Sequence, residues 1–347
     1  MGVFLRRMRT FRRLREELAT THHELFRNTA LDFQFLHFFF DIYGIIYRER
    51  YHTEALLEHY APRIYIASDV DVVQMRAQIL TAKDRGIVTM TTNHGFYLYV
   101  YPASNFEADY CLVGGRALKR NLMMGGVSED RIEIIGNPSF QSTSHVGRRG
   151  MEKKPRIVII SSAPYDLWSF QYRLAAFLEC VRTMADRLSA NRDWHVIIKS
   201  HPLSDHYFCY DAIVQQYSRS NLQHISKRWH REEFQGATVA VCLGPLSGSM
   251  LELQYFRVPI VYLDAVTPQA PNFDYQGCGL VVQTTEEVCE AVEQLVRDEK
   301  YRESVVSQGS MFLYKYTNFP DNSLDRFSTA LVRILQDTSQ PTPQSVQ

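Results

Sequence analysis

The chain has 347 residues, 45% of them hydrophobic, which is enough to build two domains of ordinary size with a core in each. Its 38 basic and 38 acidic residues cancel, so no overall positive field favours a nucleic-acid partner. The longest apolar stretch, residues 33–47, spans only about 15 positions and includes His37 and Asp41, so it predicts a buried helix, not a membrane span.

The first 60 residues are expected to be helical, and they lack a signal-peptide pattern because charges interrupt the apolar residues. Within residues 1–18 apolar side chains recur at helical spacing, and arginines take most of the remaining surface. The apolar positions are Phe4, Met8, Phe11, Leu14 and Leu18. Either this helix lies on an anionic membrane surface, or its apolar stripe packs on its own domain. The first alternative predicts a cytoplasmic protein that is peripheral at the inner face of the cell membrane.

After residue 60, short apolar runs alternate with amphipathic segments, which is the pattern of parallel sheets covered by helices. The expected strands are RIYIAS from Arg63, IVTMTT from Ile87, ADYCLVGG from Ala108, RIEIIGNP from Arg131, RIVIISSAP from Arg156, HVIIKSHP from His195, LQHIS from Leu222, TVAVCLG from Thr238, PIVYLD from Pro259 and LVVQ from Leu280. Helices are expected over 72–84, 117–124, about 170–188, 207–217, 249–257, 285–315 and 322–336.

The polar, glycine-bearing stretch 141–155 is the best linker candidate and divides the chain into domains. We expect a helical segment over 1–60, a first α/β domain over 61–145 and a second over 155–320. A closing helix over 321–336 and a disordered tail over 337–347 complete the chain.

The six cysteines show neither CxxC pairs nor zinc-like spacing, and several sit in apolar runs. They are Cys111, Cys180, Cys209, Cys242, Cys278 and Cys289. We interpret them as buried thiols of a reducing compartment.

Three expected strands of the second domain end in residues that suit an anionic ligand. Ser161 and Ser162 follow RIVII, Lys199 and His201 follow HVII, and a small-residue turn follows TVAVCLG. That turn and the helix after it contain Ser247, Gly248, Ser249 and Glu252. Ligands of open α/β sheets bind at the carboxyl ends of strands, where helix N-termini attract phosphate. Each residue has a structural alternative: Ser249 and Glu252 fit a capping box, and Lys199 fits a solvated strand edge.

Two strand ends of the first domain carry candidate acid/base residues. Asp69 and Asp71 follow the strand RIYIA, and His94 follows IVTMTT. An imidazole there acts as a general base near neutral pH, and a carboxylate either does the same work or orients the imidazole. The structural alternatives are a helix cap for Asp69 and a polar turn for His94.

The order of motifs along the chain resembles the GT-B architecture. These motifs are SD after a strand, HG after the next strand, residues 108–138, KSHP and SGSMLE. Within it, residues 60–335 resemble bacterial enzymes of surface polysaccharide assembly. These are capsule sialyltransferases with related CMP-sugar transferases, and CDP-glycerol glycerophosphotransferases. The resemblance implies that His201, Ser247 and Ser249 hold the donor phosphates and that His94 takes part in catalysis.

Residues 108–138 and the later HP also resemble the non-hydrolysing UDP-N-acetylglucosamine 2-epimerases, which share the fold. This chain has TTNHGFY where that family has an EAG segment, and SSAPYDL where it has an HRREN-like segment. SDVD is also only a loose match to the paired acidic residues and glycine of the capsule sialyltransferases.

We therefore expect a GT-B-like α/β protein with two doubly wound domains and a cleft between them. The expected activity is metal-independent transfer of a CMP-, UDP- or CDP-activated sugar onto a surface polysaccharide or glycolipid. His94 or Asp69 is the expected base, Glu252 is expected to bind the ribose, and no cofactor is expected. Alternatives are a nucleotide-sugar 2-epimerase, a CDP-polyol phosphotransferase on the same scaffold, or a catalytically idle partner of another transferase.

Overall fold

The computed structural model describes residues 13, 16, 29–68, 73–92, 107–138, 154–161, 174–200, 210–226, 234, 236–243, 248–264, 277–318 and 322–337. The chain forms two compact units. The first comprises residues 1–94, 102–112 and 334–347, and the second comprises 95–101 and 113–333. Both sheets are parallel, which confirms the expected α/β class. The expected linker lies mostly outside the described residues.

A long helix, α2 (Thr29–Tyr60), precedes the first sheet. The elements after it are β1 (Ile64–Ala67), α3 (Val73–Asp84), β2 (Val88–Thr92), β3 (Tyr110–Val113), α4 (Arg116–Met124), the 3-10 turn η3 (Glu129–Arg131) and β4 (Ile132–Ile134). The strands run in the order β1-β2-β3-β4. The elements β1, α3, β2, β3 and α4 fall within two residues of the segments that apolar periodicity predicted, which is the usual variation of helix and strand ends. The strand β4 is shorter than the expected RIEIIGNP, and the 3-10 turn was not predicted.

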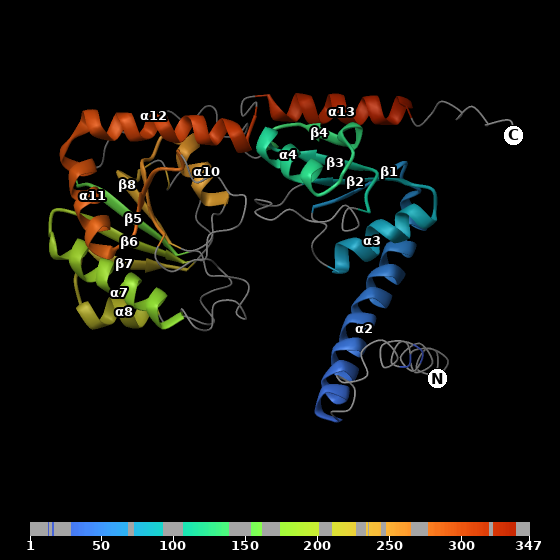
Figure 1. The fold of residues 1–347 in the computed structure, drawn as a ribbon, viewed down its shortest axis with the longest axis horizontal. Helices are drawn as coiled ribbons and strands as arrows, with labels where there is room; N and C mark the ends of the chain where they lie inside the picture. Colours follow the sequence, from blue (N-terminus) through green and yellow to red (C-terminus); the bar gives the residue numbers. More distant parts are fainter. Residues whose placement is uncertain are drawn as a thin grey trace, which may run out of the picture. The chain divides into compact units, whose positions relative to one another are not determined.

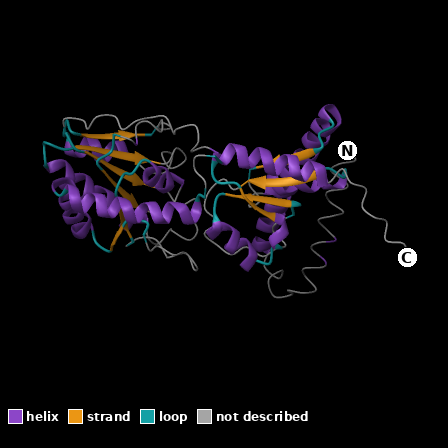
Figure 2. Cartoon of the chain, turned by 90° about the horizontal axis from the view of Figure 1, so that it is seen from above, coloured by secondary structure: helices purple, strands orange, loops and turns teal. Residues whose placement is uncertain are grey.

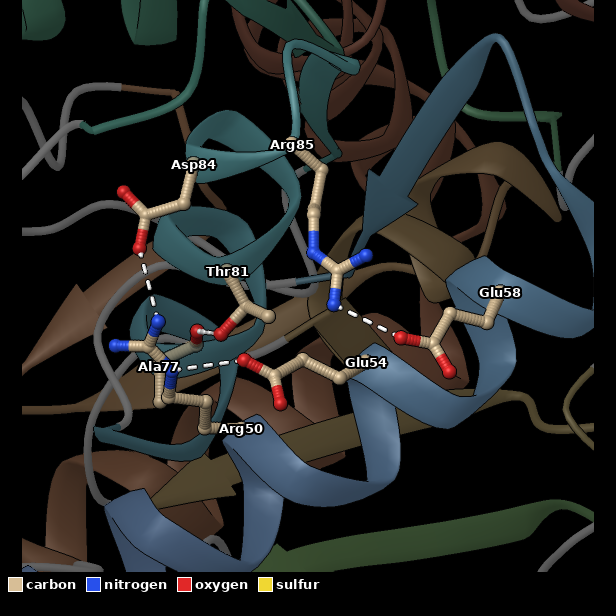
Figure 3. A network of polar contacts seen from close by, with 7 residues as sticks. All are labelled: Arg50, Glu54, Glu58, Ala77, Thr81, Asp84 and Arg85. Carbon is tan, nitrogen blue, oxygen red and sulfur yellow. Dashed lines mark hydrogen bonds and ion pairs between the residues drawn. The ribbon is translucent and has the colours of Figure 1, made fainter.

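Helix α2 packs beside α3 through a network of surface ion pairs (Figure 3). The Arg50 guanidinium lies 3.0 Å from Glu54 and 3.4 Å from Asp84, so it joins the two helices. Arg85, just after α3, lies 3.0 Å from Glu58 of α2. All these side chains are at least one-third exposed, so each pair contributes little free energy of folding, about 0–1 kcal/mol.

The second unit contains a six-stranded sheet. Its strands are β5 (Arg156–Ser161), β6 (His195–Ser200), β7 (Leu222–Ile225), β8 (Val239–Leu243), β9 (Ile260–Leu263) and β10 (Leu280–Val282). Its helices are α7 (Leu174–Ala190), α8 (Tyr210–Tyr217), α10 (Gly248–Tyr255), α11 (Thr285–Arg297), α12 (Glu299–Tyr316) and most of α13 (Ser323–Asp337). The strand order is β10-β9-β8-β5-β6-β7, the doubly wound order in which the chain reverses direction between β5 and β8.

The two faces of this sheet are covered by different helices (Figures 1 and 2). One face packs against α7, α8 and α11 in a continuous core. Its strand residues are Ile157, Ile159, Val196, Ile198, Leu222, Val239, Val241, Leu243, Val261 and Leu263. Right-handed crossovers place α7 and α8 on this face and α10 on the opposite one, because the chain steps across the sheet in opposite directions from β5 and from β8.

The last turn of α12 packs against a pair of glycines just before α4, within the second unit. The backbone N–H of Asn318 donates to the carbonyl of Gly114 at 2.8 Å, and the Arg116 N–H donates to the Asn318 side-chain oxygen at 3.1 Å. A Cβ on Gly115 would lie 2.5 Å from the carbonyl carbon of Tyr316. This approach of two backbones therefore requires glycine.

The substitution Gly115→Ala should destabilise the protein by about 1–3 kcal/mol, because the new methyl group collides with backbone that cannot rotate away. Thermal unfolding measures the effect. Gly44→Ala is the matched control: a Cβ at this helical position meets nothing within 4 Å, so alanine should leave stability unchanged or raise it. Equal melting temperatures for the two variants would contradict this packing.

No helix in the described part of the chain is both long and apolar enough to cross a bilayer. Of the amphipathic segment 1–18, only Arg13 and Glu16 are described; both are helical and exposed. Membrane association therefore stays a prediction. The expected disordered tail began at Asp337, but this residue is the last of α13, and the rest of the tail lies outside the described residues.

Candidate functional site

Three strand ends of the six-stranded sheet lie side by side at the point where the strand order reverses. Ser161, the last residue of β5, is level with Ser200 on β6 and with Leu243 on β8. These are the strands whose ends carry the anion-binding candidates, and they are neighbours in one sheet. In doubly wound sheets this switch point is where the crevice for a ligand opens.

The candidates at this edge divide between the two faces of the sheet, because successive strand residues point to opposite sides. Lys199 is level with Ile160, on the face opposite the α7–α8–α11 core, and therefore on the α10 side. It is 7% exposed, and its ammonium donates to the carbonyl of Ser200. An ammonium and the first turn of α10 therefore share one face of the edge.

Helix α10 begins at Gly248, so Ser249 lies in its first turn and Glu252 one turn further on. Gly248 is exposed, and a Cβ there would meet nothing within 4 Å. Ser249 and Glu252 are half-buried. The N–H groups of a first helical turn suit an anionic group, while Glu252 can accept hydrogen bonds from hydroxyls.

On the other face of the edge, Ser161 and Ser200 are buried and hydrogen-bonded to side chains of α8 and β7. Ser161 shares a hydrogen bond with the hydroxyl of Tyr210 at the start of α8. The Ser200 hydroxyl lies 2.9 Å from Nε2 of His224, and Nδ1 of His224 lies 2.8 Å from the Asp211 carboxylate. Ser161 and Lys199 thus do not point into one common space.

Sequence reasoning missed this chain of Tyr210, His224 and Asp211. His224 lies within the short strand LQHIS, and Asp211 lies one turn into a helix, so nothing in their spacing pairs them. The one available signal was the alternation of strand residues between the two faces of the sheet. It places His224 on the same face as Leu222, which is covered by α7, α8 and α11. The ring centroids of Tyr210 and His224 are 5.3 Å apart. The hydroxyls, the imidazole and the carboxylate therefore form one packed group near the ends of β5 and β6.

Five candidates lie outside the described residues: Asp69, His94, Ser162, His201 and Ser247. The described residues next to them show which strands their segments follow. The strands β1 and β2 are paired in parallel with Ala67 level with Thr91, so the segments carrying Asp69 and His94 leave from adjacent strand ends. Their roles stay predictions.

The sheet beneath the edge is apolar. Cys242 on β8 is fully buried, and burial raises the pKa of its thiol far above its usual range, so it is neutral at physiological pH. Cys111 and Cys278 are also buried, while Cys180 and Cys289 are half-buried, all with free thiols. No group of three or more His, Cys, Asp or Glu side chains among the described residues lies close enough to hold a metal ion.

No model of a protein family matches the chain, and no curated protein matches it. Similar solved structures include a Listeria monocytogenes protein proposed to be a UDP-N-acetylglucosamine 2-epimerase (TM-score 0.61, 13% identity, 86% of this chain and 82% of that one). A second is S. aureus MnaA with UDP (TM-score 0.59, 14% identity, 86% and 81%). A third is the Neisseria meningitidis UDP-GlcNAc 2-epimerase with UDP-GlcNAc (TM-score 0.57, 13% identity, covering 84% of this chain and 82% of that one).

This chain has a GT-B-like fold. The expected scaffold is confirmed, and the similarity covers most of the chain. At such low identity the similarity establishes the fold and not the reaction.

Proposed function

We propose that the protein is a metal-independent glycosyltransferase that binds a nucleotide-activated sugar at the edge formed by β8, β5 and β6. The observation that carries this proposal is the level alignment of Ser161, Ser200 and Leu243 at the reversal of strand order, with α10 beginning just beyond β8. This arrangement supplies an ammonium and a helix N-terminus to a phosphate on one face. It suits a CMP-, UDP- or CDP-linked donor equally.

In the proposed reaction an acceptor hydroxyl attacks the anomeric carbon of the donor. A new carbon–oxygen bond forms while the bond between that carbon and the donor phosphate breaks. The bonding electrons stay on the phosphate oxygen, and the proton of the acceptor hydroxyl passes to His94 or Asp69. Lys199, His201, Ser247, Ser249 and the first turn of α10 stabilise the negative charge on the leaving phosphate, and electrostatic stabilisation of this kind is often the largest single contribution to catalysis.

The acceptor proposed for this reaction is a glycan or glycolipid of the cell surface, and residues 1–18 are proposed to bring the enzyme to an anionic membrane. Both parts rest on the sequence: the resemblance to surface-polysaccharide enzymes and the arginine-rich amphipathic stripe. An idle partner of another transferase would keep the fold but would lose affinity for nucleotides.

A nucleotide-sugar 2-epimerase is the second candidate. Two of the similar solved structures favour it: the Listeria protein is proposed to be such an epimerase, and the Neisseria epimerase is bound to UDP-GlcNAc. Against it stand TTNHGFY at the end of β2 and SSAPYDL at the end of β5, where that family has its EAG and HRREN-like segments. In addition, Ser161, the first residue of SSAPYDL, is turned toward Tyr210 and buried.

A nucleotide screen by thermal shift should reveal binding of CMP, CDP or UDP as a rise in melting temperature. Ligand at 100 times its dissociation constant stabilises the folded state by about 2.7 kcal/mol. The nucleotide that binds then identifies the donor for an activity assay. Transfer requires an added acceptor, whereas conversion of UDP-N-acetylglucosamine alone would identify an epimerase. If no nucleotide shifts the melting temperature, the glycosyltransferase proposal fails.

A further inference from the structure

We propose that a cavity between α4 and the C-terminal end of α12 binds a phosphate group carried on an apolar chain. The cavity lies within the second unit and has a volume of about 510 Å³, in the range of small-molecule sites. It shares no lining residue with the edge of β8, β5 and β6. The proposal therefore stands independently of the proposed function.

Among the described residues, three cationic side chains line this cavity: Arg116 and Arg120 of α4, and Lys315 in the last turn of α12. None of the described residues that line it is acidic. Arg116 and Arg120 are one helical turn apart, so their guanidinium groups lie on the same side of α4, where like charges destabilise a helix. A bound anion would remove that repulsion.

The two arginines differ from the neighbouring cations of the same region. Lys119 of α4 lies 2.8 Å from the carboxylate of Glu129, and Arg333 pairs with Glu133. By contrast, neither Arg116 nor Arg120 has a carboxylate within ion-pair distance in the part of the chain that the structure describes. Both are exposed. Planar guanidinium groups of this kind fit the oxygens of a phosphate in a bidentate manner.

Two large side chains of α12 that line the cavity are exposed. Met311 and Tyr314, three residues apart on that helix, are 65% and 55% exposed, and both line the cavity. A ligand that places its anionic group on the arginines would therefore cover a methionine and an aromatic ring with its remaining part. This combination selects a phosphate on an apolar body over a free phosphate ion.

The base of the cavity is held by backbone contacts and does not need to form on binding. Asn318 lines the cavity and joins the end of α12 to Gly114 and to the N–H of Arg116, and Gly115 brings the two backbones into contact. A preformed site loses little affinity to ordering of the protein.

The test is titration calorimetry of the full chain with n-octyl phosphate below its micelle concentration, inorganic phosphate and UMP. We expect n-octyl phosphate to bind, with an affinity that falls as salt is added, and inorganic phosphate to bind at least tenfold more weakly. The double variant Arg116→Gln/Arg120→Gln should weaken n-octyl phosphate binding at least tenfold. Tyr314→Ala should weaken n-octyl phosphate more than inorganic phosphate.

The control is Arg182→Gln/Arg297→Gln, which removes the same charge from exposed surface ion pairs on α7 and α11. It should bind n-octyl phosphate as the unchanged protein does. Equal affinities of the two double variants, or no binding by the unchanged protein, would overturn the proposal. The proposal would also be overturned if the Arg116/Arg120 variant no longer bound UMP but still bound n-octyl phosphate, because the cavity would then be a nucleotide site. Retained UMP binding supports separate sites.

Discussion

The variant His94→Ala should lower kcat by about 10² to 10⁴ while donor affinity stays unchanged, because general-base catalysis contributes a factor of this size and the donor is held by other residues. The segment carrying His94 follows β2, whereas the proposed donor contacts come from β6, the segments after β6 and β8, and α10. Rates with saturating donor and acceptor, together with nucleotide titrations, separate these two quantities.

The pH profile adds a second readout for His94. A histidine base must be neutral to accept a proton, so activity should rise with pH as the imidazole loses its proton, and this rise should be absent in the variant. His59→Ala is the control, since His59 is an exposed histidine at the end of α2. If Asp69→Asn causes the large loss and His94→Ala does not, the base follows β1 and the assignment to His94 is wrong.

The sequence was sufficient to predict the elements and the edge at which the candidates gather. The runs RIVII, HVII and TVAVCL are continuous and β-branched, as expected for strands buried on both faces, and each became a strand within a residue or two. Small and polar residues directly after these runs then marked the carboxyl ends. Parallel strands that all end at one edge made this prediction possible without any knowledge of strand order.

What the sequence did not contain was the register between strands. Ser161 is level with Ser200 and not with Lys199, and this single offset turns the serine and the lysine to opposite faces. Register depends on the packing of many side chains together, including those of α7, which connects β5 to β6 and packs on one face of the sheet. For the same reason His224 gave no signal, since its partners Ser200 and Asp211 belong to a different strand and a helix.

The glycine pair after β3 illustrates the same limit. Gly114 and Gly115 stand at the end of the expected strand ADYCLVGG, and nothing near them in the sequence shows why they are glycines. The backbone of Lys315 and Tyr316, some 200 positions later along the chain, occupies the space that their side chains would take. The sequence shows that a glycine lacks a side chain, but it does not show which distant part of the chain fills the space beside that glycine.

Lys199→Met should raise the dissociation constant for the donor nucleotide roughly 10- to 100-fold, because a hydrogen bond to a charged group contributes about 1.5–3 kcal/mol. Lys199 is 7% exposed at the end of β6, on the same face as the first turn of α10. Methionine has a similar length and volume, so it fills the space of the lysine stem without the charge. Titration calorimetry with the nucleotide found by the thermal-shift screen measures the loss.

A purely structural lysine would behave in the opposite way, which makes this variant decisive. Burying an ammonium costs free energy, and replacing it with an apolar side chain of the same shape is often neutral or stabilising. If Lys199 serves the ligand, Lys199→Met should therefore keep or raise the melting temperature of the free protein and lose most of the rise that nucleotide produces. Lys300→Met, at an exposed position in the first turn of α12, should change neither quantity. A lower melting temperature combined with unchanged nucleotide affinity would show that Lys199 supports the sheet and not the donor phosphate.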